Sequence, residues 1–129
     1  MKRIKSISEK RLIIEAEVNG KSAFFLLDSG ASIALIDSDK KKVYGLKVGR
    51  KYSGTIVGAG GEMSNIRCCD TFVHFEGKTI TQFLLADIGN VVRSIKKETG
   101  IEILGIISLP QMSMIGMNLD INSLEVWLE

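Results

Sequence analysis

The sequence is poor in the side chains that most metal sites and many nucleophilic sites require. Its 129 residues include one histidine, His74, and two cysteines, Cys68 and Cys69, which are adjacent. A zinc site therefore lacks enough soft ligands, and His74 is expected to be an ordinary strand residue, not a catalytic base. Because neighbouring residues of a strand point to opposite faces, a disulfide between the two cysteines would be strained. We expect free thiols in a reducing, cytoplasmic environment.

The sequence also lacks a large excess of either charge, and it has no long apolar runs. The 17 lysines and arginines are interleaved with 15 acidic residues, which leaves a net charge of +2. This pattern argues against a nucleic-acid partner, and the densest basic run, Lys40–Lys42, is typical of a solvated loop. No apolar stretch of the sequence has the length of a signal peptide or a membrane span, so no membrane partner is expected.

What remains is the composition of an ordinary globular domain, 45% hydrophobic and 25% charged, at a length that suits a single domain over residues 1–129. Alternating and β-branched segments predict a mainly β fold, with hairpin turns at Asn19-Gly20 and Glu76-Gly77. Strands are expected at Lys2–Ser8, Arg11–Val18, Ser22–Leu27, Ile33–Asp37, Leu46–Lys51, Ile66–Phe75, Lys78–Ala86, Ile101–Leu104, Met114–Asp120 and Leu124–Leu128.

One or two short helices are expected among these strands. Asn90–Thr99 has apolar residues at helical spacing, and Gly100 follows as a stop signal. Ser38–Tyr44 is polar and basic, which fits a loop or a short helical turn. Ile106–Met112 is ambiguous; because proline disrupts a helix interior, Pro110 favours a short helix that ends near Leu109.

A glycine-rich tip lies between strand-forming residues in the segment Tyr52–Met63. This composition is typical of a mobile β-hairpin. A phosphate-binding loop is the alternative, but the run Gly58-Ala59-Gly60-Gly61 lacks the following Lys-Ser/Thr pair and the strand-loop-helix setting. The sequence therefore favours the hairpin.

The most informative stretch is Phe24–Asp37, with the sequence FFLLDSGASIALID. Four apolar residues lead directly into Asp28, and a second apolar run follows the turn. Gly30 permits a sharp bend, so Asp28 is expected at the end of a buried strand, pointing out of the turn. A carboxylate between two apolar runs is costly unless it has partners or a function. The simpler interpretation is an Asx turn, in which Asp28 bonds only to nearby amides.

The segment Leu26–Ser32 resembles the active-site motif of the retropepsin-like aspartic proteases, in which two apolar residues precede Asp-Thr/Ser-Gly-Ala. Ile103-Leu104-Gly105 resembles the apolar-apolar-Gly element that, in this family, precedes a short helix and packs beneath the active-site loop. The glycine-rich hairpin lies between the two, as it does in a retropepsin protomer. The resemblance spans about Leu12 to Leu128.

The resemblance implies a closed retropepsin-like β-barrel, the fold of one acid protease lobe, and an endopeptidase that needs neither cofactor nor metal. The chain has one such motif, so the active form is expected to be a homodimer in which Asp28 of each subunit contributes to a pair of carboxylates. Ser29 would lock the two loops together, and the final strand Leu124–Leu128 would interleave with its counterpart. The predicted catalytic residues are Asp28, Ser29 and Gly30, and the predicted peptide-binding residues are Ala31, Ser32, Val57, Gly58, Ala59 and Gly60.

Two departures from the viral pattern leave alternatives open. Many viral members carry Asp after the Ala of the motif and Arg after the apolar-apolar-Gly element, where this chain has Ser32 and Ile106. A catalytically inactive relative that binds peptide or dimerises is therefore the second hypothesis. A third is a small β-barrel with an unrelated ligand, in which Asp28-Ser29-Gly30 is only a turn.

Overall fold

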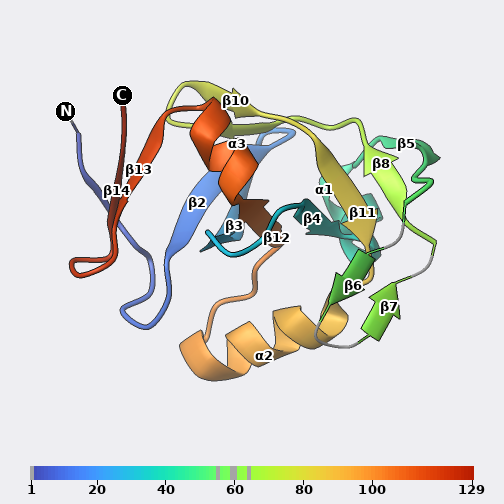
Figure 1. Cartoon of the computed structure of the whole chain (residues 1–129), viewed down its shortest axis with the longest axis horizontal. Helices are drawn as coiled ribbons and strands as arrows, with labels where there is room; N and C mark the ends of the chain where they lie inside the picture. Colours follow the sequence, from blue (N-terminus) through green and yellow to red (C-terminus); the bar gives the residue numbers. More distant parts are fainter. Residues whose placement is uncertain (1, 55, 59–60, 64) are drawn as a thin grey trace.

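The computed structural model describes residues 2–54, 56–58, 61–63 and 65–129, and within them the protein is mainly β, with three short α-helices (Figure 1). The strands form a nine-stranded sheet in the order β10-β9-β2-β3-β12-β4-β11-β8-β5, a three-stranded sheet in the order β1-β14-β13, and the separate hairpin β6-β7. The strands are β1 Ile4–Lys5, β2 Ile13–Val18, β3 Lys21–Asp28, β4 Ala34–Asp37, β5 Val48–Lys51, β6 Ile56–Gly58, β7 Gly61–Met63, β8 Arg67–Cys69, β9 Val73–Phe75, β10 Lys78–Ile80, β11 Phe83–Ala86, β12 Gly105–Ser108, β13 Met117–Asp120 and β14 Glu125–Leu128. The helices are α1 Lys41–Tyr44, α2 Gly89–Thr99 and α3 Leu109–Met114, and a 3₁₀ turn, Ser38–Lys40, precedes α1.

The β2–β3 hairpin brings the chain to Asp28. Asn19 and Gly20 both have positive φ angles, of 51° and 80°, which is the conformation that a two-residue turn between twisted strands requires. The ladder continues past β2 itself, because the amide of Leu27 donates to the carbonyl of Leu12 at 2.9 Å. The predicted hairpin and its turn are therefore confirmed.

Strand β12 lies between β3 and β4, parallel to β3 and antiparallel to β4. Gly105 allows this packing, because a Cβ there would overlap the carbonyl oxygen of Leu35 and lie 3.1 Å from the ring of Phe25. The prediction of a strand at Ile101–Leu104 was wrong: these residues precede the strand, which begins at Gly105 itself. The helix predicted to end near Leu109 also differs, because α3 begins at that residue. Pro110 lies in the first turn, where its missing N–H is not needed.

A long hairpin supplies strands to both ends of the nine-stranded sheet. Its tip, β9–β10, turns at Glu76 and Gly77 and lies beside β2, whereas its base, β8–β11, lies beside β4. The sheet therefore curls strongly, yet its outer strands β10 and β5 are not paired with each other in the described ranges. The predicted closed barrel is thus not confirmed, and the sheet is a curled, open one.

The terminal sheet joins the two ends of the chain. The final hairpin is present, with β13 and β14 paired in antiparallel register, but β14 also pairs with β1 along its other edge. One edge of the final strand is therefore paired along its length, and its other edge is paired at Glu125 and Val126 within the same chain.

Two apolar clusters stabilise this arrangement. The larger lies between the curled sheet and the terminal sheet and includes Phe25, Phe83 and Val126. The second lies between the sheet and α2, the predicted helix, which buries Val92 and Ile95 and ends at Gly100 with a φ of 79°. None of the helices in the described part of the chain is long and apolar enough to cross a membrane.

We expect Gly105→Ala to destabilise the protein by about 2–3 kcal/mol, because the added Cβ meets backbone that is fixed by two ladders. Urea unfolding measures this. Gly100→Ala provides the comparison: its Cβ meets nothing within 4 Å, so only the positive φ opposes it, at about 1–2 kcal/mol. A smaller loss at Gly105 than at Gly100 would contradict the close-packing argument.

Candidate active site

Asp28 is the last residue of β3 and begins an exposed turn. Its Oδ1 accepts a hydrogen bond from the amide of Gly30 at 3.0 Å, and its carbonyl accepts one from the amide of Ala31 at 3.1 Å. Asp28, Ser29 and Gly30 are all exposed, while Ala31 is half-buried. The Asx turn that the sequence suggested is therefore present, and it holds the carboxylate in the exposed part of the loop.

Strand β12 holds this loop from the other side. Ser108 is the register partner of Asp28, and the amide of Leu109 donates to the carbonyl of Ala31 at 3.2 Å. The segment that lies against the loop and immediately precedes the short helix is therefore Ile106-Ile107-Ser108, not Ile103-Leu104-Gly105 as the sequence suggested. Both triplets begin with two aliphatic residues, and the strand register shows which of them lies against the loop.

The residue that follows the triplet, where many viral members carry Arg, is therefore Leu109 and not Ile106. Leu109 is 52% exposed, and Ser32 is exposed as well. The Asp and Arg of the viral pattern are thus absent under either alignment. Ser108 itself was not predicted; its place directly before a Leu-Pro helix start was the only signal in the sequence.

The glycine-rich hairpin and the Asp28 loop pack on one apolar cluster. Ile56 of β6 and Met63 of β7 lie partly buried against the cluster that also holds Ala31, Ile33 and Ile106. The predicted hairpin is confirmed, with Val57 opposite Glu62 and Gly58 opposite Gly61. The predicted binding residues Val57 and Gly58 are in β6, whereas Ala59 and Gly60 lie outside the described residues.

An ion pair adjoins the loop and was not predicted from the sequence. Arg11 donates from Nε and Nη2 to the two carboxylate oxygens of Glu98, at 2.7 and 3.0 Å. The Leu27–Leu12 hydrogen bond places Arg11 across from Asp28 in the continued β2–β3 ladder. Glu98 raises the pKa of Arg11, with a smaller contribution from the charge of Asp28, and Arg11 in turn lowers the pKa of Glu98. The C-terminal turn of α2 is thereby tied to the strand beside the loop.

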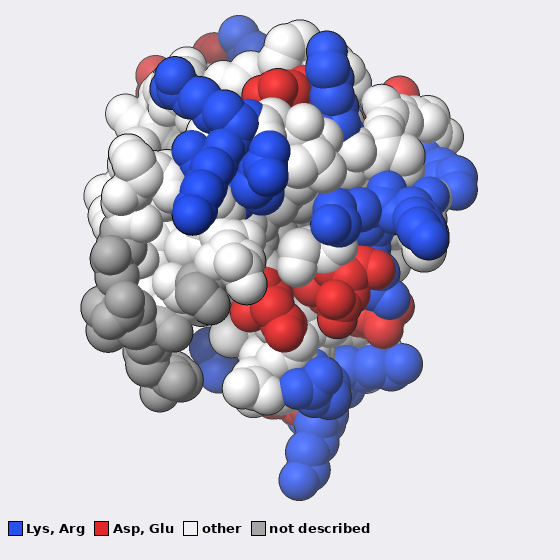
Figure 2. Space-filling model, turned by 90° about the vertical axis from the view of Figure 1, so that its right-hand side faces the viewer, with Lys and Arg blue, Asp and Glu red and all other residues white. Residues whose placement is uncertain are grey.

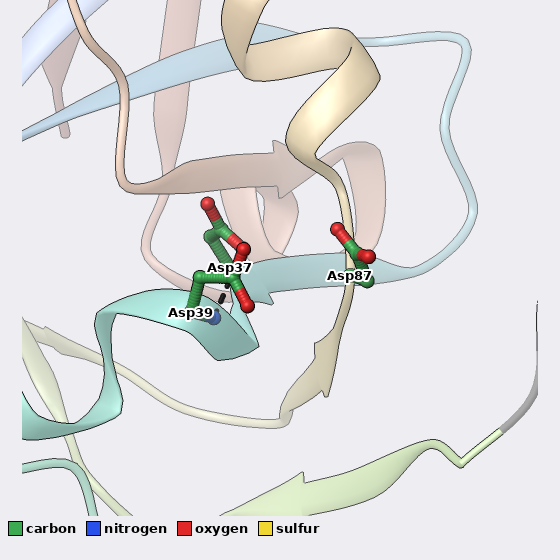
Figure 3. Close-up of side chains that lie close together, drawn as sticks. All are labelled: Asp37, Asp39 and Asp87. Carbon is green, nitrogen blue, oxygen red and sulfur yellow. Dashed lines mark hydrogen bonds between the residues drawn. The ribbon is translucent and has the colours of Figure 1, made fainter.

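A separate acidic group lies where β4 and β11 end. Carboxylate oxygens of Asp37, Asp39 and Asp87 lie within 4.8 Å of one another (Figure 3). Such oxygens suit hard cations, but two of these carboxylates already have local roles. Asp37 Oδ1 accepts from the amide of Asp39 at 3.1 Å and caps the 3₁₀ turn, and Asp87 Oδ1 accepts from the amide of Gly89 at 3.0 Å at the start of α2. We assign no ion to this group.

The remaining reactive side chains are dispersed. His74 is an exposed residue of β9, as predicted, and its Nδ1 lies 3.3 Å from the hydroxyl of Thr79. Cys68 and Cys69 are free, and burial raises the pKa of the Cys69 thiol. On the face shown in Figure 2, groups of basic side chains surround a central group of acidic ones.

Comparisons with known proteins agree with this geometry. A family model described as "Aspartyl protease" matches residues 14–119. The EIAV protease, solved with the inhibitor HBY-793, superposes with a TM-score of 0.65 at 23% identity, over 92% of this chain and 100% of the viral one. The retroviral protease-like domain of Ddi1 from Leishmania major superposes with a TM-score of 0.61 at 18% identity, over 92% of this chain and 88% of that one. No curated protein matches the chain. These likenesses show a retropepsin-like fold.

Asp37 yields a test that is independent of the Asp28 loop. It is only 3% exposed, and burial, the largest cause, raises the pKa of its carboxyl group. The unfolded chain therefore loses this proton at lower pH than the folded protein does, so stability falls as the pH rises from the unfolded-state pKa to the folded-state pKa. We expect Asp37→Asn to become more stable relative to the wild type as the pH rises from about 3 to 7, as measured by urea unfolding. The exposed Glu9→Gln is the control, and a difference independent of pH would contradict the expectation.

Proposed function

The chain belongs to the aspartyl protease family, and from this premise we propose that it is an aspartic endopeptidase that acts as a homodimer. The observation that supports this most directly is the exposed carboxylate of Asp28 at the end of a buried strand, in a loop held by β3 on one side and β12 on the other. The chain supplies one such loop. A second copy would bring the second carboxylate to the axis between the subunits.

In the proposed mechanism, the two Asp28 carboxyl groups lie close together and share one proton, since two like charges about 3 Å apart cannot both ionise. The ionised group takes a proton from a water molecule between them, which attacks the scissile carbonyl. The protonated group donates a hydrogen bond to that carbonyl as negative charge develops on it. Gly30 and Ala31 hold each carboxylate and its loop in place through their amides, at 3.0 and 3.1 Å.

The substrate in this proposal is an extended peptide that lies under the β6–β7 hairpin. Val57, Gly58, Ala59 and Gly60 would bind it through backbone amides and carbonyls, and Ala31 and Ser32 would contact it from the loop. The shared apolar cluster supports this assignment, because it seats the hairpin base and the loop on the same surface. Closure of such a hairpin would exclude water from the reacting groups.

A second candidate is a catalytically inactive relative that binds peptides. The observation in its favour is the pair Ser32 and Leu109, which offers neither the carboxylate nor the guanidinium that grips substrate backbone in the viral pattern. Both candidates use the same proposed peptide site, so peptide binding alone does not separate them.

We expect Asp28→Asn to lower the rate of peptide cleavage by at least about 10²–10⁴-fold, because the amide cannot take part in proton transfer. The measurement is turnover of a pooled peptide library at acidic to neutral pH. Asp39→Asn removes an exposed carboxylate outside the loop and should retain activity. Proteolysis by Asp28→Asn at the wild-type rate would refute the assignment.

A statine-type inhibitor, which mimics the tetrahedral intermediate, separates the two candidates. If the protein is a protease, the inhibitor should bind the wild type, abolish its turnover and bind Asp28→Asn more weakly. Calorimetric titration measures the binding. Inhibitor binding to a wild-type protein that cleaves no peptide in the library would favour the inactive relative.

A further inference from the structure

The hydroxyl of Ser108 is buried beside the Asp28 turn without a partner. Ser108 is 0% exposed, and its Oγ has no hydrogen bond in the described part of the chain. Leaving a buried hydroxyl unsatisfied destabilises a protein, so a hydroxyl kept in such a place needs an explanation.

Capping of helix α3 does not explain this hydroxyl. Ser108 is the N-cap residue of α3 and has the extended backbone that suits a cap, with φ −91° and ψ 169°, but its side chain makes no capping bond. A serine in this place normally accepts a hydrogen bond from the amide of the second or third helical residue. The second is Pro110, which has no N–H, and only the amide of Gln111 remains. One of the two usual donors to a serine cap is therefore missing.

The side chains of Ser108 and Asp28 belong to the same face of the sheet. The two residues are register partners in the parallel ladder between β12 and β3. Two residues earlier on the same strands, Ile106 and Leu26 are also register partners, and both lie in the second apolar cluster. Because side chains alternate along a strand, Ser108 and Asp28 return to the side of that cluster. This is the side on which the base of the β6–β7 hairpin packs.

Strand spacing puts the two side chains within reach of each other. Neighbouring strands lie about 4.8 Å apart, and the hydroxyl of Ser108 and the carboxylate of Asp28 both extend from strands with that spacing. Asp28 Oδ1 is held by the amide of Gly30 at 3.0 Å, whereas Oδ2 has no hydrogen bond among the described residues. A change of rotamer at either residue can bring the hydroxyl within hydrogen-bond distance of Oδ2. The unpartnered donor and the unpartnered acceptor are thus neighbours in one ladder.

We propose that Ser108 is a positioning residue of the active site, whose hydroxyl donates a hydrogen bond to Oδ2 of Asp28 in the same subunit. The inference rests on the proposed function, in which Asp28 is the reacting carboxylate. Both carboxylate oxygens are then fixed, Oδ1 by the amide of Gly30 and Oδ2 by the end of β12. A carboxylate held at both oxygens keeps the orientation that proton sharing requires. A donor on its ionised form also favours that form over the protonated one.

The charged groups around this carboxylate, besides the second Asp28, are few. Strand β12 and helix α3 contain none. Arg11 lies across from Asp28 in the continued β2–β3 ladder and is bound by Glu98 of α2. The β6–β7 hairpin contributes Glu62. A substitution at Ser108 leaves all of these groups in the chain, so a change in pH dependence reports the loss of the hydroxyl.

The first test is the pH dependence of kcat/KM for a peptide that the wild type cleaves. In Ser108→Ala, the acid limb of the profile should move up by about 0.5–1 pH unit, because the catalytic base loses the donor that favours its ionised form. We expect kcat to fall by at least about 3-fold, as one hydrogen bond to a charged group is lost. Ser108→Thr keeps a hydroxyl and should keep the wild-type acid limb. A folded Ser108→Ala with the wild-type acid limb would overturn the inference.

Gln111→Met is the matched control on the same helix. Gln111 is buried, its Nε2 donates to the carbonyl of Gln82 at 3.2 Å, and its Oε1 has no hydrogen bond among the described residues. Losing the bond to Gln82 should lower the midpoint of urea unfolding and leave the acid limb in place. If Ser108→Ala also loses only stability, Ser108 has a structural role alone and the inference fails. An equal shift of the acid limb in Gln111→Met would overturn it as well.

A second measurement does not require catalytic activity. Carbon-13 NMR follows the titration of the Asp28 carboxyl group, whose signal is identified by its absence from Asp28→Asn. The midpoint of this titration should rise in Ser108→Ala, or in Ser108→Gly if the alanine variant does not fold. If it rises in a protein that cleaves no peptide, the hydrogen bond stands and the protease assignment fails. If the wild type cleaves peptides while the midpoint and the acid limb both stay unchanged, the positioning role fails alone.

Discussion

The insertion of β12 between β3 and β4 is the arrangement on which the rest of this structure depends. It pairs Ser108 with Asp28 and places the amide of Leu109 against the carbonyl of Ala31, so the turn that carries the carboxylate is held by main-chain bonds from two strands. The approach of the three strands is close enough that Gly105 has no space for a side chain. The loop is exposed, and its position is nevertheless fixed by buried strands beneath it.

The same arrangement explains why one subunit makes half of the proposed site. The loop presents one carboxylate, and the surroundings supply a cation nearby, Arg11, which is itself bound to Glu98. The other close group of acids, Asp37, Asp39 and Asp87, lies at the ends of β4 and β11, where Asp37 caps the 3₁₀ turn and Asp87 accepts from the amide of Gly89 at the start of α2. Under the proposed function, a second copy would supply the second carboxylate.

The sequence predicted much of the fold, for local reasons. Turns such as Asn19-Gly20 and Glu76-Gly77 carry their backbone preferences in their residue types, and α2 is defined by its apolar spacing and by Gly100. Where the prediction failed, the structure depends on contacts between residues that are far apart in the sequence. Proline disrupts a helix interior but suits the first turn of a helix. Whether Pro110 ends a helix or begins one depends on where β12 ends. Local physics also left open whether the Asp28 turn is more than an ordinary Asx turn, and the family match supports the role proposed for it.

By itself, the sequence determined that this is a mainly β domain with a carboxylate at a glycine turn after a buried strand, because strand periodicity, turn residues and the Asp-Ser-Gly-Ala motif are local properties of the chain. Tertiary structure alone decided which segment lies against Asp28, that Arg11 and Glu98 meet beside it, and that β14 lies between β1 and β13. These features join residues far apart in the sequence. Strand register fixes such contacts, and register depends on the packing of the whole sheet and not on any one segment of it.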